Sequence, residues 1–332
     1  MAKINAICHN VMENEVLRRS SQVLSVIGDR AYVFGGELRP REPRDNDVHV
    51  VSLGSGNTTI TSEPATSTSP SPRVGTAACT LNGKIYIFSG RGGVAMAPIE
   101  EQGAVWEFDP ATAKWSLILP ADTSAKTPVA RSYHCTASDG EDTLYLHAGC
   151  PEKGRLSDLW AFSLSRRVWT ELSPASDPPR GGASIAFADG RLYRMNGFDG
   201  NTEQGGSLDI YSLETASWTS HVYSPDGKAG PAARSVSCLL PLRLNDRPFL
   251  VTLFGEHDPS SLGHQGAGKM LSDIWAFDME RQGWEEVAVH GDRPLARGWF
   301  DADVIGNTIV VHGGLGESND RLGDVWTIEL SG

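Results

Sequence analysis

The segment YVFGG at residues 32–36 decides the fold, because closely similar segments occur five more times along the chain. Each copy is a short apolar run that ends in one or two glycines. The later copies are YIFSG at 86–90, YLHAG at 145–149, YRMNG at 193–197, LVTLFG at 250–255 and IVVHGG at 309–314. Their last glycines lie 54, 59, 48, 58 and 59 residues apart. A period of this length indicates an array of similar units.

A second expected strand follows each of these segments and usually opens with Asp and an aliphatic residue. These strands begin DVH at 47, VW at 105, DLW at 158, DIY at 209, DIW at 273 and DVW at 324. Four repeats then close with a tryptophan: Trp115, Trp169, Trp218 and Trp284. Hairpin signals such as NG at 82–83 and DG at 189–190 join an earlier apolar segment to each glycine strand. The pattern predicts four antiparallel strands per unit, with the tryptophans packed between units.

The composition of the 332-residue chain agrees with a large all-β protein. It has 36 glycines and 39% hydrophobic residues, while helix-period apolar patterns are nearly absent. The net charge of −12, with no Lys or Arg stripe, argues against nucleic acid and anionic membranes as partners. No apolar run approaches the roughly 20 residues that span a bilayer. Five scattered cysteines, none in a CxxC pair, indicate a reducing compartment, so we expect a soluble cytoplasmic protein, with a homodimer left open.

The repeats resemble the kelch motif, which places a glycine pair after a hydrophobic strand and a tryptophan near the end of each unit. The resemblance covers almost the whole chain and implies a single six-bladed kelch β-propeller domain over residues 1–332. Two departures are visible. Ile60 stands where the first closing tryptophan is expected, and the last repeat ends at Gly332 after its third strand. Residues 4–11 are therefore expected to supply the missing outer strand of the sixth blade.

An arginine stands just before each expected innermost strand. The six are Arg19, Arg73, Arg131, Arg180, Arg234 and Arg297. In an up-and-down blade this position shares one face with the loop that follows the glycine pair. Six guanidinium groups there would ring the channel mouth and bind an anionic substrate bidentately. In the alternative reading, each arginine bridges to carbonyls or carboxylates of the scaffold, and Glu37 and Asp199 are candidate acidic partners.

The loop after the fifth glycine strand is the longest on that face and carries a possible metal-ligand set. It reads GEHDPSSLGHQGAGKMLSD over 255–273 and contains Glu256, His257, Asp258 and His264. A site of two histidines and one carboxylate suits ferrous iron. A hydrogen-bonded turn that binds no metal is the alternative.

This loop resembles that of the specifier proteins of glucosinolate breakdown in mustard-family plants. The likeness lies in the glutamate after the glycine, the Pro-Ser pair and the Gly-His-x-Gly-Ala-Gly that follows. The resemblance implies Fe(2+) at a Glu-x3-Asp-x3-His pattern, which falls here on Glu256, Ser260 and His264. Asp258 or His257 is an alternative third ligand. It also implies that arginines hold the sulfate of the unstable substrate, with Arg73, Arg131 and Arg234 the matching candidates.

The sequence thus favours a specifier-like lyase that acts on an anionic reactive intermediate. Glu256, His264 and Arg131 are the catalytic candidates, and Trp299, which follows Arg297-Gly298, is an expected substrate contact. A metal-free cyclase or lyase that uses the same pocket is one alternative. A protein-interaction propeller without enzymatic activity is the other. No serine-hydrolase elbow, P-loop or dinucleotide fingerprint occurs in the sequence.

Overall fold

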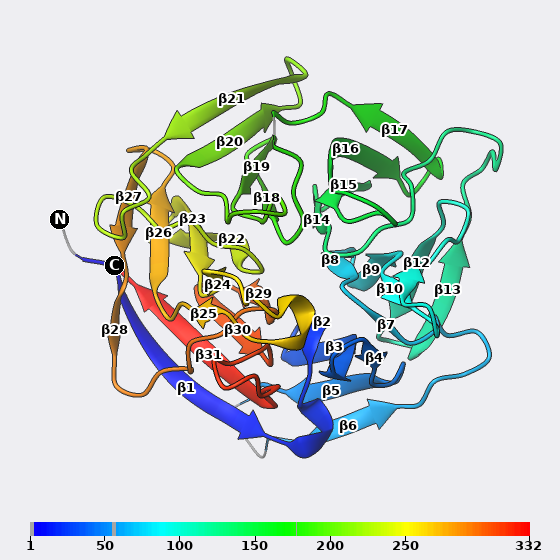
Figure 1. Cartoon of the computed structure of the whole chain (residues 1–332), viewed down its shortest axis with the longest axis horizontal. Coiled ribbons are helices and arrows are strands. Elements are labelled where there is room, and N and C mark those ends of the chain that lie inside the picture. Colours follow the sequence, from blue (N-terminus) through cyan, green and yellow to red (C-terminus); the bar gives the residue numbers. More distant parts are fainter. Residues whose placement is uncertain (1–2, 55–57, 177) are drawn as a thin grey trace.

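The computed structural model describes residues 3–54, 58–176 and 178–332, and of His264 it describes the backbone only. These residues form β-strands with two short 3-10 helices, η1 (Glu15–Leu17) and η2 (Gly263–Gln265). The strands gather into antiparallel sheets that stand around a central axis like the blades of a propeller (Figure 1). Within the described ranges, no helix is long and apolar enough to cross a membrane.

Six blades follow one another along the chain, each running from the axis outward. Blade one holds β2 (Ser20–Ile27), β3 (Arg30–Arg39), β5 (Val48–Ser52) and β6 (Ile60–Glu63), with the short β4 (Glu42–Pro43) paired to β3. Blade two holds β8 (Ala77–Leu81), β9 (Lys84–Phe88), β12 (Val105–Asp109) and β13 (Lys114–Ile118). Blade three holds β14 (Cys135–Ser138), β15 (Thr143–Gly149), β16 (Leu156–Ser163) and β17 (Val168–Leu172).

The second half of the chain repeats this arrangement. Blade four holds β18 (Ser184–Ala188), β19 (Arg191–Met195), β20 (Ser207–Ser212) and β21 (Ser217–Val222). Blade five holds β22 (Cys238–Leu244), β23 (Arg247–Leu253), β26 (Ile274–Asp278) and β27 (Gly283–Glu286). Blade six holds β29 (Asp301–Ile305), β30 (Thr308–His312) and β31 (Asp324–Ser331). Smaller strands lie in the loops: β7 (Arg73–Val74), β10 (Arg91–Gly92), β11 (Ala97–Pro98), β24 (Glu256–His257) and β25 (Lys269–Met270).

The N-terminal strand supplies the outer strand of blade six, as the sequence predicts. β1 (Asn5–Glu13) pairs antiparallel with β31 along nearly its whole length (Figure 1). The short β28 (Ala288–His290) covers the other edge of β1 in parallel register. The first and last parts of the chain therefore share one sheet, and the outer edge of β31 is covered.

The closing tryptophans pack between blades, which confirms their predicted role. Trp115 lies against Phe34 of blade one, with ring centroids 4.9 Å apart, and belongs to the core shared by blades one and two. Trp169, Trp218 and Trp284 occupy the next three interfaces in the same way. Ile60 packs at the interface of blades six and one, where a tryptophan is missing.

A belt of main-chain hydrogen bonds joins the six blades around the axis. The residue two places after each arginine donates its N–H to the carbonyl of its counterpart in the preceding blade, over 2.6–3.1 Å. The belt runs through Ser21, Gly75, Tyr133, Gly182, Val236 and Trp299 and returns to Ser21. All six adopt positive φ, between 47° and 62°. This conformation is unusual for Tyr and Trp and is an outlier for the β-branched Val236, so the ring holds these residues in strained conformations.

Ala6 tests the contribution of β1 to stability. Its side chain is fully buried in the core of blades five and six, whereas the neighbouring Ile7 is half exposed. Ala6→Asp buries an unpaired carboxylate and should lower the free energy of unfolding by at least about 3 kcal/mol. Ile7→Asp should change it by less than about 1 kcal/mol. Urea denaturation of the two variants makes the comparison, and equal losses would show that β1 is not packed as described.

Candidate functional site

The six arginines that precede the innermost strands lie inside the blades, and this differs from the expected open ring. Arg19, Arg73, Arg131, Arg234 and Arg297 have no exposed surface, and Arg180 keeps 5%. Each points along its own blade and donates to a main-chain carbonyl at the end of the second strand, as Arg131 does to Ala148. The five arginines without exposed surface are bonded within their blades, and this arrangement favours the scaffold role that the sequence left open.

Five of these arginines also hold a carboxylate of their own blade. Arg131 Nη1 and Nη2 lie 2.6 and 2.8 Å from the two oxygens of Asp158. The other four pairs are Arg19 with Asp45, Arg73 with Glu101, Arg234 with Asp273 and Arg297 with Asp324. In four blades a tryptophan indole N–H donates to the same carboxylate, as Trp160 does to Asp158 over 2.8 Å. These bonds lower the pKa values of Asp273 and Asp324 against the raising effect of burial.

The blade-five loop does not bring its described candidate ligands into a metal set. Glu256 is buried, and its Oε1 accepts the Gly268 N–H over 2.9 Å. Asp258 is largely exposed and lies 3.6 Å from the His257 imidazole. The Ser260 hydroxyl accepts the Leu262 N–H, and the side chain of His264 lies outside the described residues. Among the residues that the structure describes, no three His, Cys, Asp or Glu side chains could hold a metal ion.

The carboxyl group of Glu256 has a raised pKa. Burial and the nearby Glu203 raise its pKa to about 7, while the Gly268 N–H opposes the change. The loop itself is tied to blade six, because Met270 N–H donates to Glu317 and Asn319 donates to the Gln265 carbonyl. Figure 1 shows this loop, with η2, reaching toward the central opening.

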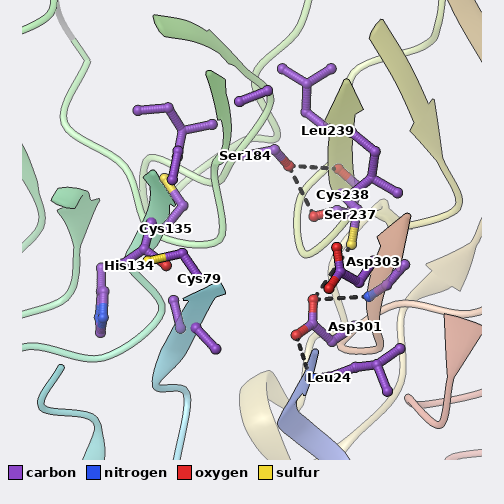
Figure 2. Close-up of a pocket in the computed structure, with 18 of the residues that line it drawn as sticks. Leu24, Cys79, His134, Cys135, Ser184, Ser237, Cys238, Leu239, Asp301 and Asp303 are labelled. Atoms are coloured by element: carbon purple, nitrogen blue, oxygen red, sulfur yellow. Dashed lines mark hydrogen bonds between the residues drawn. The ribbon is translucent and has the colours of Figure 1, made fainter. Parts of the chain in front are cut away.

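A cavity of about 300 Å³ lies along the axis beneath the belt, between the innermost strands. Figure 2 shows Cys79 and Cys135 on one side of it and Cys238, Asp301 and Asp303 on the other. Burial raises the pKa of the Cys79 and Cys135 thiols to about 12, so both stay protonated. Among its described lining residues there is no Lys or Arg. The cavity therefore offers neither a thiolate nor a cation for an anionic substrate.

The two cavity aspartates bind blade six to blade one. Asp301 accepts the Leu24 N–H and Asp303 accepts the Val26 N–H, each over 2.7 Å. Burial raises the pKa of Asp301 to about 7 and also raises that of Asp303. These carboxyl groups therefore act in assembly of the ring, and Asp301 titrates near neutral pH.

A second pocket, of about 180 Å³, opens among the loops of blades one to three and has a different character. Three arginines that the sequence analysis did not select line it: Arg41, Arg91 and Arg155. None of the three forms a salt bridge with any described carboxylate. We call this the outer pocket, and its unpaired positive charge suits an anion.

Neighbouring groups hold the outer-pocket arginines in place. Arg91 donates to the carbonyls of Met96 and Pro151 and to the Ser132 hydroxyl. Arg155 lies over the Phe198 ring at 5.0 Å. Since a guanidinium carries five N–H donors, Arg91 keeps donors for a ligand after these bonds are made.

Tyr133 and Glu37 complete the outer pocket. Tyr133 lies between this pocket and the axial cavity and contacts Trp299 edge to face, with ring centroids 5.3 Å apart. The two Glu37 oxygens accept the Arg321 guanidinium over 3.0 Å and the Arg41 N–H over 2.7 Å. Glu37 is thus already bonded to two groups of the protein, and Glu152 is the second acid of the pocket lining.

The repeat itself contains a signal that points to Arg91. It directly follows the glycine of YIFSG, the position that Glu37 and Glu256 occupy in blades one and five. The other blades place Cys150, Phe198 and Leu315 there. The residue type at this position varies among the blades from acidic to basic to apolar, whereas the arginine before each innermost strand is present in all six. Variable side chains on a constant scaffold are typical of a binding face.

The comparisons with known proteins agree with this architecture. A family model, the KLHDC2/KLHL20/DRC7 Kelch-repeats domain, matches residues 21–255. The chain belongs to the Kelch-repeat family. The solved structure of YjhT superimposes with a TM-score of 0.72 over 95% of this chain and 96% of that one, at 14% identity. That likeness supports the kelch fold alone.

Two curated relatives differ in how much of them this chain covers. The chain is 26% identical to the N-(sulfonatooxy)prop-2-enimidothioate sulfolyase of Thlaspi arvense, over 93% of this chain and 91% of that protein. It is 22% identical to the Leucine-zipper-like transcriptional regulator 1 homolog of Drosophila melanogaster, over 95% of this chain but 31% of that protein. The sulfolyase is thus a relative along nearly its whole length, in agreement with the specifier-like resemblance.

The raised pKa of Asp301 predicts a pH-dependent stability of the kelch ring. The folded protein keeps this proton up to about pH 7, whereas an unfolded aspartic acid loses it near pH 4. The stability that this proton contributes is therefore present at low pH and is lost as pH rises through that window. Asp301→Asn removes the ionisation and keeps an oxygen for the Leu24 N–H. Relative to wild type, it should gain up to about 1.4 kcal/mol of unfolding free energy per pH unit between about pH 4 and pH 7.

Urea denaturation over that pH range provides the measurement. Asp29→Asn is the control, since it removes a carboxyl group from an exposed position. A pH-independent difference between Asp301→Asn and wild type would contradict the buried, proton-binding state of Asp301.

Proposed function

We propose that this kelch propeller binds a small anionic, sulfur-containing intermediate in the outer pocket and steers its breakdown, as a specifier-like lyase. The supporting observation is the set of three guanidinium groups, Arg41, Arg91 and Arg155, that line one pocket without a carboxylate partner among the described residues. The full-length relationship to a sulfolyase supports the proposed substrate class, a compound with a sulfonatooxy group on nitrogen.

The outer-pocket arginines would act on the leaving group. In a lyase reaction of such a substrate the N–O bond breaks, and the bonding electron pair leaves with the sulfate oxygen. The electron pair of a bond from the adjacent carbon, to its sulfur or to its side chain, moves toward the nitrogen and replaces the lost bond. Arg91 and Arg155 are held in fixed positions by carbonyls and by the Phe198 ring, so their charges need no rearrangement as negative charge grows on the sulfate. Fixed donors of this kind stabilise developing charge better than water does.

The aromatic pair at the belt would hold the rest of the substrate. Tyr133 forms the side of the outer pocket toward the axis, and Trp299 packs against it. An apolar side chain of the substrate would lie on the Tyr133 ring, next to the sulfate held by Arg91. Trp299, which lines the axial cavity, would act by positioning Tyr133 and would not touch a substrate in the outer pocket.

Ferrous iron at the blade-five loop is a separate part of the proposal and rests on the Glu256 and His264 spacing. The described residues do not fit a three-ligand site, since Asp258 faces solvent and Ser260 is bonded within the loop. The steps above therefore depend on no metal. Glu256, with a pKa of about 7, is available instead as a proton donor or acceptor near neutral pH.

Arg91→Ala and Arg155→Ala test the outer pocket. Each should lower kcat/KM by at least about tenfold, because each removes a donor to the leaving sulfate. The assay measures the product distribution from a freshly generated N-sulfonatooxy thioimidate, with and without protein. Arg243→Ala, at an exposed position on the hairpin of blade five, is the control and should behave as wild type. Unchanged turnover in both pocket variants would exclude this pocket as the reaction site.

A peptide-binding face is the other use of the same arginines. It would show as tight binding of an acidic peptide, lost in Arg91→Ala, with no change in product distribution in any variant.

Metal analysis tests the iron part. Protein purified anaerobically with added ferrous iron is compared with the Glu256→Ala/His264→Ala double variant. Near-stoichiometric iron that is lost in the double variant supports a site at this loop. Equal iron contents in the two proteins would remove iron from the proposal and leave the outer pocket unaffected.

A further inference from the structure

Blade four departs from the rule that each innermost-strand arginine holds a carboxylate. In the sheet register Asp209 pairs with Arg194 just as Trp160 pairs with Leu146 in blade three, so Ser207, two residues before Asp209, occupies the place of Asp158. Arg180 keeps the two main-chain contacts of its counterparts, to Asn196 and Pro178 over 3.0 and 3.2 Å. It forms no salt bridge with any described residue. A full positive charge is thus buried without a paired carboxylate.

The surroundings of Arg180 add more positive charge. The nearby Arg194 is fully buried, and its Nε and Nη2 have no hydrogen-bond acceptor among the described groups. Its only ion pair there is with Asp209, at 3.7 Å. His147 Nε2 of blade three is also buried without a partner. Among the described residues, one carboxylate, that of Asp209, lies near two guanidinium groups, so the donors at the interface of blades three and four outnumber the acceptors.

The remaining charges nearby do not satisfy Arg180. Burial and Arg194 lower its pKa to about 10, while Asp209 and Asp199 oppose the change without reaching ion-pair distance. Asp158 is taken up by Arg131 and the Trp160 indole. Arg180 also retains 5% exposure, whereas the other five arginines have none.

We infer that blade four contains an anion-binding site, in which a small carboxylate such as acetate or formate takes the place that Asp158 fills in blade three. The geometry of the five sister blades defines the ligand: a planar, two-oxygen anion bound side-on to Arg180 and close to Arg194. The site is distinct from the outer pocket and requires no turnover there.

Acetate is the probe, and the melting temperature is the readout. Wild-type protein should gain about 2–4 °C as acetate saturates the site. Ser207→Asp supplies the carboxylate from the chain, so it should melt higher than wild type without acetate and gain nothing from it. Ser217→Asp, at an exposed position of the same blade, adds the same charge and should keep the wild-type response. All variants are measured in identical buffers, which removes general effects of ionic strength.

Two further variants test whether the missing carboxylate creates the acetate site and whether that site differs from the outer pocket. Asp158→Ser should create the same arrangement in blade three, lowering the melting temperature and adding a second acetate response. Arg91→Ala should keep the wild-type acetate response, which separates this site from the outer pocket. An acetate response that is absent in wild type, or equal in wild type and Ser207→Asp, would overturn the inference.

Discussion

The main-chain belt around the axis is the constraint on which the rest of the molecule depends. Six N–H groups and six carbonyls close a ring only if every blade meets the next at the same height and angle. This requirement forces positive φ on Tyr133, Val236 and Trp299, which glycine would adopt at lower cost. The paired arginines lie two residues before the belt, and their carboxylates and carbonyls fix the strand ends from which it is built. The protein can bury the charges of these paired arginines because each one lies against a carboxylate of opposite charge.

This fixed frame explains why chemistry is found one residue after each glycine. The arginine and belt positions are committed to assembly, whereas the residue after the glycine contributes main-chain hydrogen bonds, such as Cys150 N–H to the Ser132 carbonyl, that any side chain allows. Its side chain can therefore be an acid in blade five, a base in blade two and a thiol in blade three. Arg91 and Cys150 meet in the outer pocket for this reason, although 59 residues separate their neighbouring glycines.

The fold was accessible from the sequence because its signals are periodic. Glycine strands, tryptophans and the incomplete last repeat predict the blades and the place of the N-terminal strand, and β1 lies there. The function of the arginines was not accessible in the same way. An arginine that recurs in every repeat is compatible with an open ring or with a buried pair, and its partner lies 26 to 28 residues away in four blades but 39 in blade five. Arg155, in an irregular loop, has no counterpart to mark it.

The axial cavity and the outer pocket differ in the charge that they offer to an anionic ligand. The protein carries a net charge of −12, so an anionic ligand is repelled at long range and must be held by local charge. The axial cavity cannot provide that charge, because its thiols are protonated, and burial lowers the pKa of His134 to about 3 and leaves it neutral. Asp301 would add negative charge there above about pH 7. The outer pocket has three arginines, none of which forms a salt bridge with a described carboxylate; of the two acids in its lining, Glu37 is already bound by Arg321, and Glu152 is the other. An anion that enters the propeller from the mouth would thus stop at the belt, above Tyr133 and Trp299.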